Sequence, residues 1–375
     1  MEKWKHSVNG ITIDLDDVEK VKAVDAEGML LGLEHFPDQC EEAVRLAGET
    51  PLDFLPAWPH GHGRVPSLNS ILIMGMGGSG ISGDITKTIL SDEVKVPIWV
   101  SKGYSIPSFV DRGTLCFAVS YSGDTEETLS CFDQAVRLGC PIISIASGGM
   151  LESAAQKHGM PLIKIPGGIQ PRSALGYLTL PILIALQKSD IIANKMGDIE
   201  ETIKLLKDKA KKLSLSRPCE QNGAKGLAIK LFGRIPVVYG SDGPTAVAAL
   251  RWKCQFNENA KIPAFWHVFP ELNHNETVGW ELLENITENF YLILLRDEGE
   301  PERIKRRIEI TRSLIEDHFG DVVEVWAEGK SKLTRTFSII YFGDFVSAYL
   351  AVLNGVDPTP VHRITLLKKK LAESS

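Results

Sequence analysis

The sequence predicts an α/β protein with two doubly wound parallel sheets, one in each half of the chain, and a C-terminal helix over about 360–372. Short apolar runs bounded by glycine, proline or serine predict the strands, because they lack the alternation of strands with one exposed face. Helical patterns separate these runs, and an alternation of strands and helices is typical of parallel sheets. The same order of runs recurs in the second half, which predicts the second sheet.

Five apolar runs in the first half are the predicted strands of the first sheet. After the third run, the segment 122–139 places apolar residues at helical spacing, begins with capping residues and ends at Gly139, so it predicts a helix. The five runs are SILIMGMGG (70–78), VPIWVS (96–101), LCFAVSYSG (115–123), PIISIAS (141–147) and PLIKIP (161–166).

The second half repeats this design more loosely. A chain of 375 residues is long enough for two domains, and a helical stretch over 198–213 lies between the halves. The predicted domains are 1–193 with leading helices, a connecting helix at 194–215, and 216–375 with the C-terminal helix. The predicted strands of the second domain are RIPVVYGSDG (234–243), NFYLILLRD (289–297) and DVVEVWAEG (321–329).

Charge and composition exclude several classes of protein. A formal net charge of −7 argues against a nucleic-acid partner and against an anionic membrane surface. No apolar run reaches the roughly 18 residues of a membrane helix, and the N-terminus lacks the apolar core of a signal peptide. The six cysteines show no CxxC pair and no metal-ligand spacing, so free thiols in a reducing cytosol are expected. A soluble cytoplasmic protein is therefore predicted.

The first run ends in GMGGSG (75–80), which satisfies the GxGxxG pattern of dinucleotide-binding proteins. That interpretation also needs an acidic residue at the end of the next strand, to bind the ribose. The next strand ends in Ser101 and Lys102, whereas Asp92 and Glu93 precede it. NAD binding is therefore disfavoured, and no cofactor is expected.

A phosphate site explains this loop better when it is combined with SYSGDTEET (120–128) after the third run. Hydroxyls and N–H groups at a helix N-terminus bind compact anions, and ligands of open α/β sheets bind at the carboxyl ends of strands. Ordinary helix capping explains one such loop equally well, but two loops together favour a phosphate monoester. The predicted phosphate-binding residues are Gly77, Gly78, Ser79, Ser120, Ser122 and Thr125.

Three further residues are candidates for catalysis. Arg172 follows a proline and precedes a helical run, where it would stabilise developing negative charge or form a surface ion pair. Glu258 and His274 each stand between two asparagines, so each belongs either to a solvated turn or to a pair of proton-transfer groups. His267 follows an apolar run and is predicted to be structural. HGHG (60–63) has no third type of metal ligand nearby, which favours a loop.

Seven motifs occur in this order: GMGGSGISGD, SYSGDTEET, QPRSALG, NENAK, ELNHNE, GDFVSAYLA and GVDPTPV. Together they resemble the bifunctional phosphoglucose/phosphomannose isomerase family, which has two sugar-isomerase (SIS) domains, over about residues 20–370. SYSGDTEET is shared by SIS domains in general, whereas NENAK followed by ELNHNE is far more specific. The resemblance implies metal-independent interconversion of glucose 6-phosphate and mannose 6-phosphate with fructose 6-phosphate through a cis-enediol.

The resemblance also implies roles for individual residues. Glu258 would move a proton between neighbouring carbons, and His274 of the other subunit of a homodimer would open the sugar ring. Arg172 would stabilise the enediolate, and Lys368 and Thr359 would contact the substrate. The second half would not bind a second phosphate, because Thr245 is its only hydroxyl near a helix start and three acids would repel an anion: Asp242, Asp297 and Glu298.

Two other functions of SIS domains are the alternatives. A non-catalytic sugar-phosphate sensor that regulates transcription would carry a basic helix-turn-helix region. The segment 1–65 is acidic overall and contains no such region. A glucosamine-phosphate synthase would need a cysteine directly after the initiator methionine, where this sequence has Glu2. The isomerase is therefore favoured over both.

Overall fold

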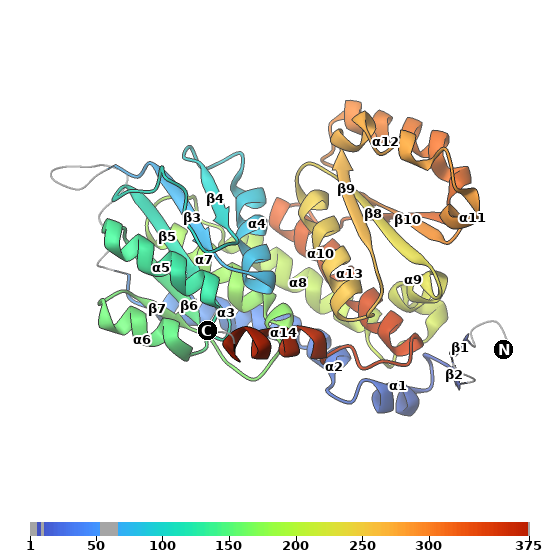
Figure 1. Cartoon of the computed structure of the whole chain (residues 1–375), viewed down its shortest axis with the longest axis horizontal. Coiled ribbons are helices and arrows are strands. Elements are labelled where there is room, and N and C mark those ends of the chain that lie inside the picture. Colours follow the sequence, from blue (N-terminus) through green and yellow to red (C-terminus); the bar gives the residue numbers. More distant parts are fainter. Residues whose placement is uncertain (1–5, 9–10, 53–66, 374–375) are drawn as a thin grey trace. The chain divides into compact units, whose positions relative to one another are not determined.

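The computed structural model describes residues 6–8, 11–52 and 67–373 (Figure 1). The chain divides into two compact units. The main sheet of each unit is parallel, so the predicted fold class of two parallel α/β sheets is confirmed. Unit 1 comprises Met1–Glu34, Lys207–Glu328 and Arg335–Ser375, and unit 2 comprises His35–Leu206 and Gly329–Thr334.

The sheet of unit 2 has the strand order β4-β3-β5-β6-β7. All five strands predicted for the first half are present. Strand β3 lies between β4 and β5, so the direction in which strands are added reverses beside β3, and ligands of such sheets bind at this reversal. The strands are β3 (Ser70–Met74), β4 (Ile98–Ser101), β5 (Thr114–Val119), β6 (Ile142–Ala146) and β7 (Leu162–Lys164).

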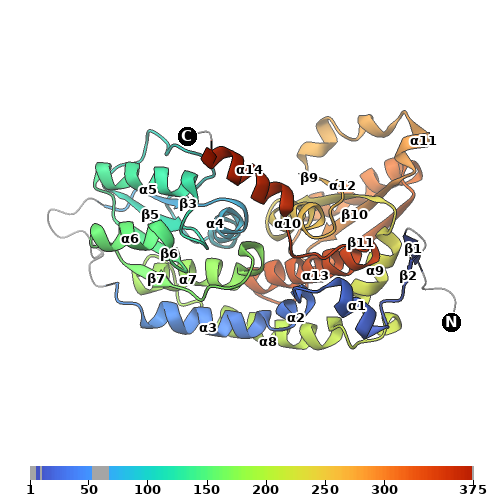
Figure 2. The same ribbon diagram turned by 60° about the horizontal axis from the view of Figure 1, so that its bottom comes forward.

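Helices cover both faces of this sheet (Figure 2), because successive side chains of a strand point to opposite faces. Leu72 packs in one core cluster with Phe132 of α5, whereas Ile73 faces Gly83 of α4. As predicted, α5 stops at Gly139, which has a left-handed φ of 73°. The helices are α3 (Phe36–Glu49), α4 (Gly77–Leu90), α5 (Glu126–Leu138), α6 (Gly149–Lys157), the short 3-10 helix η1 (Pro171–Ser173), α7 (Leu175–Lys188) and the first part of α8 (Met196–Leu213).

The sheet of unit 1 has the order β11-β10-β8-β9. The sequence predicts three of these strands and misses β9, an edge strand on which Phe265 is 53 % exposed and Trp266 37 % exposed. His267 of β9 is half-buried, and its Nδ1 accepts the N–H of Val268 (2.7 Å), so its predicted structural role stays a prediction. The strands are β8 (Ile235–Ser241), β9 (Phe265–Phe269), β10 (Phe290–Arg296) and β11 (Asp321–Trp326).

Helix α13 (Lys332–Leu353) corrects the expectation that no segment is apolar enough to cross a membrane. An 18-residue window of α13 has a mean hydropathy of 1.6, but 94 % of that window is buried inside the structure, as in a core helix. Around it, unit 1 contains the β1–β2 hairpin (His6–Val8, Ile11–Ile13), α1 (Val18–Val24), α2 (Met29–Glu34), η2 (Cys219–Gln221), α9 (Gly223–Leu231), α10 (Pro244–Glu258), η3 (Glu271–His274), η4 (Val278–Trp280), α11 (Glu284–Thr287), α12 (Glu302–Ile315), η5 (Glu316–His318) and α14 (His362–Glu373).

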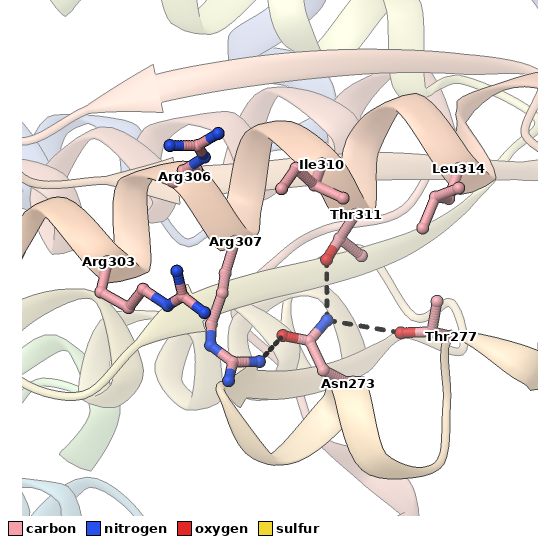
Figure 3. A pocket seen from close by; sticks show the side chains of 8 residues that line it. All are labelled: Asn273, Thr277, Arg303, Arg306, Arg307, Ile310, Thr311 and Leu314. Carbon is pink, nitrogen blue, oxygen red and sulfur yellow. Dashed lines mark hydrogen bonds between the residues drawn. The ribbon is translucent and has the colours of Figure 1, made fainter.

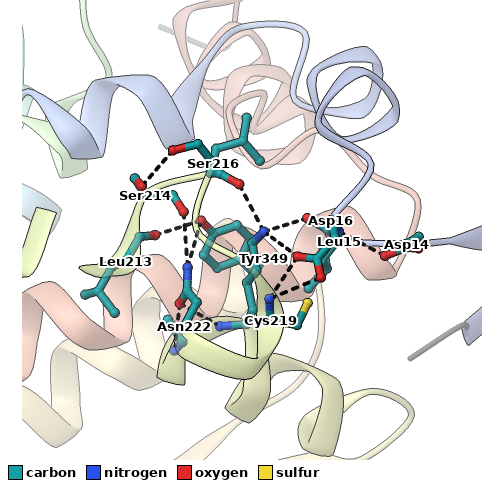
Figure 4. Close-up of polar contacts among 12 residues, drawn as sticks. Asp14, Leu15, Asp16, Leu213, Ser214, Ser216, Cys219, Asn222 and Tyr349 are labelled. Atoms are coloured by element: carbon teal, nitrogen blue, oxygen red, sulfur yellow. Dashed lines mark hydrogen bonds and ion pairs between the residues drawn. The ribbon is translucent and has the colours of Figure 1, made fainter. Parts of the chain in front are cut away.

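A buried lysine joins the N-terminal segment to unit 1. Lys225 of α9 donates hydrogen bonds to the carbonyl oxygens of Leu15 (2.7 Å) and Leu215 (3.0 Å) and to the Asp16 carboxylate (3.0 Å). The same carboxylate accepts the N–H of Cys219 (2.9 Å), as Figure 4 shows. The predicted domain 1–193 groups residues 1–34 with the sheet of unit 2. In the structure, Met1–Glu34 belong to unit 1 instead. The rest of the predicted domain division stays a prediction.

Candidate active site

The loops after β3 and β5 lie side by side, because these strands are neighbours and end at the same edge of the sheet. The N–H of Tyr121 donates to the Ser79 hydroxyl (3.3 Å). Gly75 approaches the other loop so closely that a Cβ would lie 2.9 Å from the carbonyl oxygen of Val119. Both loops of the predicted phosphate site therefore belong to one edge of unit 2.

Gly78 brings the backbone of Arg172 to the start of α4. A Cβ on Gly78 would lie 2.7 Å from the carbonyl oxygen of Pro171 and 3.1 Å from the Cα of Arg172, so only glycine allows this approach. Arg172 is 4 % exposed, unlike a surface ion-pair arginine. Gly77 is the exposed first residue of α4, and the N–H groups of a first helical turn point ahead of the helix. A helix N-terminus and a buried arginine thus meet in unit 2.

The three hydroxyl residues of the second loop differ in what they contact. The buried Ser120 hydroxyl accepts the N–H of Gly123 (3.1 Å) and donates to Thr125 Oγ1 (2.9 Å), so it stabilises the loop itself. Ser122 is exposed and accepts the N–H of Asp124 (3.2 Å). Thr125 is half-buried at the N-cap of α5. The hydroxyls of Ser122 and Thr125 accept these bonds and keep a proton to donate.

Tyr121 is a residue of this edge that the sequence reasoning missed. Its hydroxyl accepts the N–H of Ile169 (3.0 Å), and its carbonyl oxygen accepts the hydroxyl of Ser147 (2.7 Å). With its bond to Ser79, Tyr121 connects the second loop to α4, to the segment before η1 and to the end of β6. The sequence could have indicated Tyr121, because an aromatic residue inside the otherwise polar SYSG loop is expected to be buried and to hold the loop in place.

The corresponding edge of unit 1 is occupied by its own side chains. The buried Thr245 hydroxyl accepts the N–H of Ser241 (2.8 Å) and donates to the Ser241 carbonyl oxygen (3.0 Å). Asp297 is buried and forms an ion pair with Arg335 (2.8 Å). The hydroxyl and the carboxylate both serve the packing of unit 1.

Glu258 is the half-buried last residue of α10 in unit 1. Its two neighbouring asparagines hold the backbone on either side. Asn257 Nδ2 donates to the carbonyl oxygen of Ile262 (2.9 Å), and Asn259 Nδ2 donates to the Ser347 hydroxyl (2.9 Å). The two asparagines therefore fix the helix end that carries Glu258.

A pocket of ≈ 640 Å³ in unit 1 includes Glu258 in its lining. Lys261 Nζ joins two parts of the wall, since it donates to the carbonyl oxygens of Glu258, Pro358 (3.1 Å) and Pro360 (2.6 Å). His362 and Arg363 at the start of α14 add an imidazole and a guanidinium to the lining of the same pocket. No motif marks these two residues in the sequence. The full lining is Asn257, Glu258, Lys261, Val356, Asp357, Pro360, Val361, His362, Arg363 and Ile364.

Thr359 and Lys368 differ in their relation to this pocket. Thr359 is buried, and its N–H donates to the Asp357 carboxylate (2.9 Å), directly beside the wall formed by Pro360. Lys368 is exposed on α14 and is not among the described residues that line the pocket. The structure thus brings Thr359, but not Lys368, next to the surroundings of Glu258.

His274 is the exposed last residue of η3. Its neighbouring asparagines also fix the backbone: Asn273 Nδ2 donates to Thr311 Oγ1 of α12 (2.7 Å), and Asn275 Oδ1 accepts the following N–H (2.6 Å). His274 is not among the described residues that line the pocket of Glu258. Within one chain, the two proton-transfer candidates therefore do not share that pocket.

The histidine-rich stretch 60–63 lies outside the described residues. In the described part of the chain, no three residues among His, Cys, Asp and Glu gather where they could hold a metal ion. All six cysteines are free thiols, five of them buried. The groups that the side chains of the candidate residues offer for chemistry are a carboxylate, an imidazole, a guanidinium, an amine and hydroxyls.

Comparison with known proteins places the chain in a family. Residues 67–162 match the SIS domain, and residues 220–371 match the bacterial phospho-glucose isomerase C-terminal SIS domain. A bifunctional phosphoglucose/phosphomannose isomerase of Caldicellulosiruptor bescii is 44 % identical over 339 residues, which cover 90 % of this chain and 97 % of that protein. The chain belongs to the bifunctional phosphoglucose/phosphomannose isomerase family.

A second member of the bifunctional phosphoglucose/phosphomannose isomerase family, from Thermoplasma acidophilum, is 42 % identical over 311 residues, or 82 % of this chain and 92 % of that protein. Among solved structures, a glucose-6-phosphate isomerase like protein from Thermus thermophilus matches with a TM-score of 0.62 at 20 % identity. That match covers 95 % of this chain and 99 % of the other, and it concerns the fold alone. The predicted resemblance to this enzyme family and the two SIS domains are confirmed.

Proposed function

We propose that this chain interconverts glucose 6-phosphate and mannose 6-phosphate with fructose 6-phosphate through a cis-enediol, without a metal or a cofactor. The placement of Glu258 is the main support. Its backbone is held from both sides by Asn257 and Asn259, and its side chain lines a ≈ 640 Å³ pocket. A carboxylate positioned in this way suits a base that removes a proton next to a carbonyl and returns it to the neighbouring carbon.

Each remaining role is assigned to a residue whose chemistry suits it. The loops of unit 2 bind the phosphate through Gly77, Gly78, Ser79, Ser122 and Thr125, with Ser120 holding the second loop. Arg172 stabilises the enediolate, because a guanidinium keeps its charge at every relevant pH. His274 transfers the proton that opens the sugar ring, since an imidazole titrates near neutral pH. Thr359 and Lys368 contact the substrate.

We also propose that the enzyme is a cytoplasmic homodimer in which His274 serves the partner's substrate. Exposed apolar side chains that precede and follow His274 in the sequence support this assembly, because exposed apolar surface often marks a protein–protein contact. They lie on β9 and on the segment after η3, and they are Phe265, Trp266, Val278, Leu282, Leu283 and Ile286. The free cysteines agree with a reducing compartment.

Deuterium incorporation tests the proposed reaction. The purified chain is incubated with fructose 6-phosphate and a chelator in D2O, and products are followed by proton NMR. Glucose 6-phosphate and mannose 6-phosphate, both deuterated at C2, are expected. Glucose 6-phosphate alone would restrict the function to one isomerase, while binding without turnover would favour the sugar-phosphate sensor and reject catalysis.

A further inference from the structure

A second pocket of unit 1, of ≈ 300 Å³, lies between α12 and the segment that contains η3 (Figure 3). Three arginines of α12 line it, at positions i, i+3 and i+4, which lie on neighbouring parts of a helix surface. In Figure 3, Arg303 and Arg307 extend toward Asn273, whereas Arg306 extends from the other side of the helix. The full lining is Asn273, Thr277, Arg303, Arg306, Arg307, Ile310, Thr311 and Leu314.

The polar floor of this pocket, which we call the arginine pocket, is organised around Asn273. Its Oδ1 accepts a hydrogen bond from Arg307 Nη1 (3.3 Å), and its Nδ2 donates to Thr311 Oγ1 (2.7 Å) and to Thr277 Oγ1 (3.4 Å). Arg307 is therefore oriented by a neutral amide, which leaves its positive charge uncompensated. One asparagine also links the arginines to the turn that ends at His274.

The arginines of the pocket differ from the other cations of α12. Lys305 pairs with Glu302 (2.7 Å) and Arg312 with Glu316 (2.8 Å). Across the described residues, none of the three pocket arginines forms an ion pair with a carboxylate. Like charges three and four residues apart on a helix repel each other and destabilise the helix. A bound anion would remove this repulsion.

We propose that the arginine pocket binds a small phosphate monoester whose other end is apolar. Guanidinium groups bind phosphate oxygens through paired hydrogen bonds, and Arg303 and Arg307 lie next to each other on the same side of Asn273. Ile310 and Leu314 are exposed along the other part of the wall, where an apolar group would cover them. A volume of ≈ 300 Å³ admits only a small ligand. This site is separate from the phosphate loops of unit 2 and goes beyond the proposed function.

Occupation of the arginine pocket changes the turn that carries His274. A phosphate that takes the donors of Arg307 competes with Asn273 Oδ1 for them, and Asn273 then loses one of its three side-chain contacts. The N–H of Asn273 bonds to the Pro270 carbonyl oxygen (3.1 Å), so the backbone of η3 responds to its side chain. The backbone of segment 270–277 should therefore change when the ligand binds.

Calorimetric titration with phenyl phosphate tests the binding site. The full chain is compared with R303Q/R307Q, with K305Q/R312Q as a control that loses the same charge from the same helix outside the pocket, and with S122A/T125V in the phosphate loop. One binding event should weaken at least tenfold in R303Q/R307Q and persist in the other two variants. Unchanged binding in R303Q/R307Q, or equal weakening in K305Q/R312Q, overturns the proposal.

Hydrogen exchange measured by mass spectrometry tests the link to η3. Phenyl phosphate should alter exchange in peptides that cover 270–277 in the wild type and in K305Q/R312Q, but not in R303Q/R307Q. If phenyl phosphate leaves hydrogen exchange in this segment of the wild type unchanged, the link between the arginine pocket and η3 is rejected. Both measurements are independent of turnover, so the absence of isomerase activity would reject the proposed function and leave this test intact.

Discussion

Gly78 and Pro171 touch through their backbones: a Cβ on Gly78 would lie 2.7 Å from the Pro171 carbonyl oxygen. This contact holds η1, and with it the backbone of Arg172, against the first turn of α4. In the proposed function, α4 binds the phosphate and Arg172 stabilises the enediolate. The absence of one side chain therefore sets the spacing between two groups that act on the substrate.

Gly78→Ala should lower kcat/KM for fructose 6-phosphate by about 100-fold, because a displacement of about 1 Å at a catalytic group costs that much. The new Cβ meets backbone atoms, so η1 itself must move. Steady-state kinetics measures the loss. Gly226→Ala is the matched control, since a Cβ there meets no atom within 4 Å. Equal activity in the two variants would show that η1 does not set the geometry of the site.

Glu258→Gln should lower kcat by about 1000-fold with little change in KM, because general bases contribute roughly 10²–10⁴-fold and the amide keeps the shape of the side chain. Asn257 and Asn259 continue to hold the backbone, so the fold should be intact by circular dichroism. Glu309→Gln, an exposed glutamate of unit 1, serves as the control. More than a tenth of wild-type turnover in Glu258→Gln would remove this residue from the role of base.

The sheets could be predicted from the sequence because buried parallel strands appear as unbroken apolar runs between turn residues. The same rule did not find β9, because it describes buried strands and β9 is an edge strand with Phe265 and Trp266 exposed. Aromatic residues at a surface and in a core look identical in sequence. The distinction depends on what covers them in space, which no local pattern contains.

Motifs made Glu258 and the loops after β3 and β5 candidates, since the residues of each motif are consecutive in the chain. His362 and Arg363 escaped because they reach the pocket of Glu258 from a helix about a hundred residues later. The packing of the N-terminal segment escaped for the same reason: Lys225 bonds to Leu15, 210 residues away. Contacts of this range depend on the folded chain and leave no periodic trace in the sequence.

Lys225→Met should lower the free energy of unfolding by about 3 kcal/mol, because breaking a buried charged network leaves its partners unsatisfied. The carbonyl oxygens of Leu15 and Leu215 lose their donor, and Asp16 loses its cation. Urea unfolding measures the change. Lys230→Met, at an exposed position of the same helix, should stay within about 0.5 kcal/mol of the wild type. Equal stability of the two variants would mean that the network contributes nothing.

Asp25 gives unit 1 a stability term with an unusual dependence on pH. Its carboxylate accepts the N–H groups of Met29 and Leu30 (both 2.8 Å) at the start of α2. Burial raises the pKa of Asp25 to about 6, against the two hydrogen bonds that lower it. An unfolded aspartate has a pKa near about 3.9. Between about pH 4 and 6 the folded chain holds a proton that the unfolded chain has released, so stability falls as the pH rises.

Asp25→Asn should remove this term, because an amide does not titrate. The free energy of unfolding of the wild type minus that of Asp25→Asn should fall by about 2–3 kcal/mol from pH 4 to pH 7, with no further change above pH 7. Urea unfolding of both proteins in a series of buffers measures the difference at each pH. A difference for Asp25→Asn that is flat, or that rises with pH, would contradict a raised pKa, since a carboxylate stabilised by its two N–H partners gives the opposite sign.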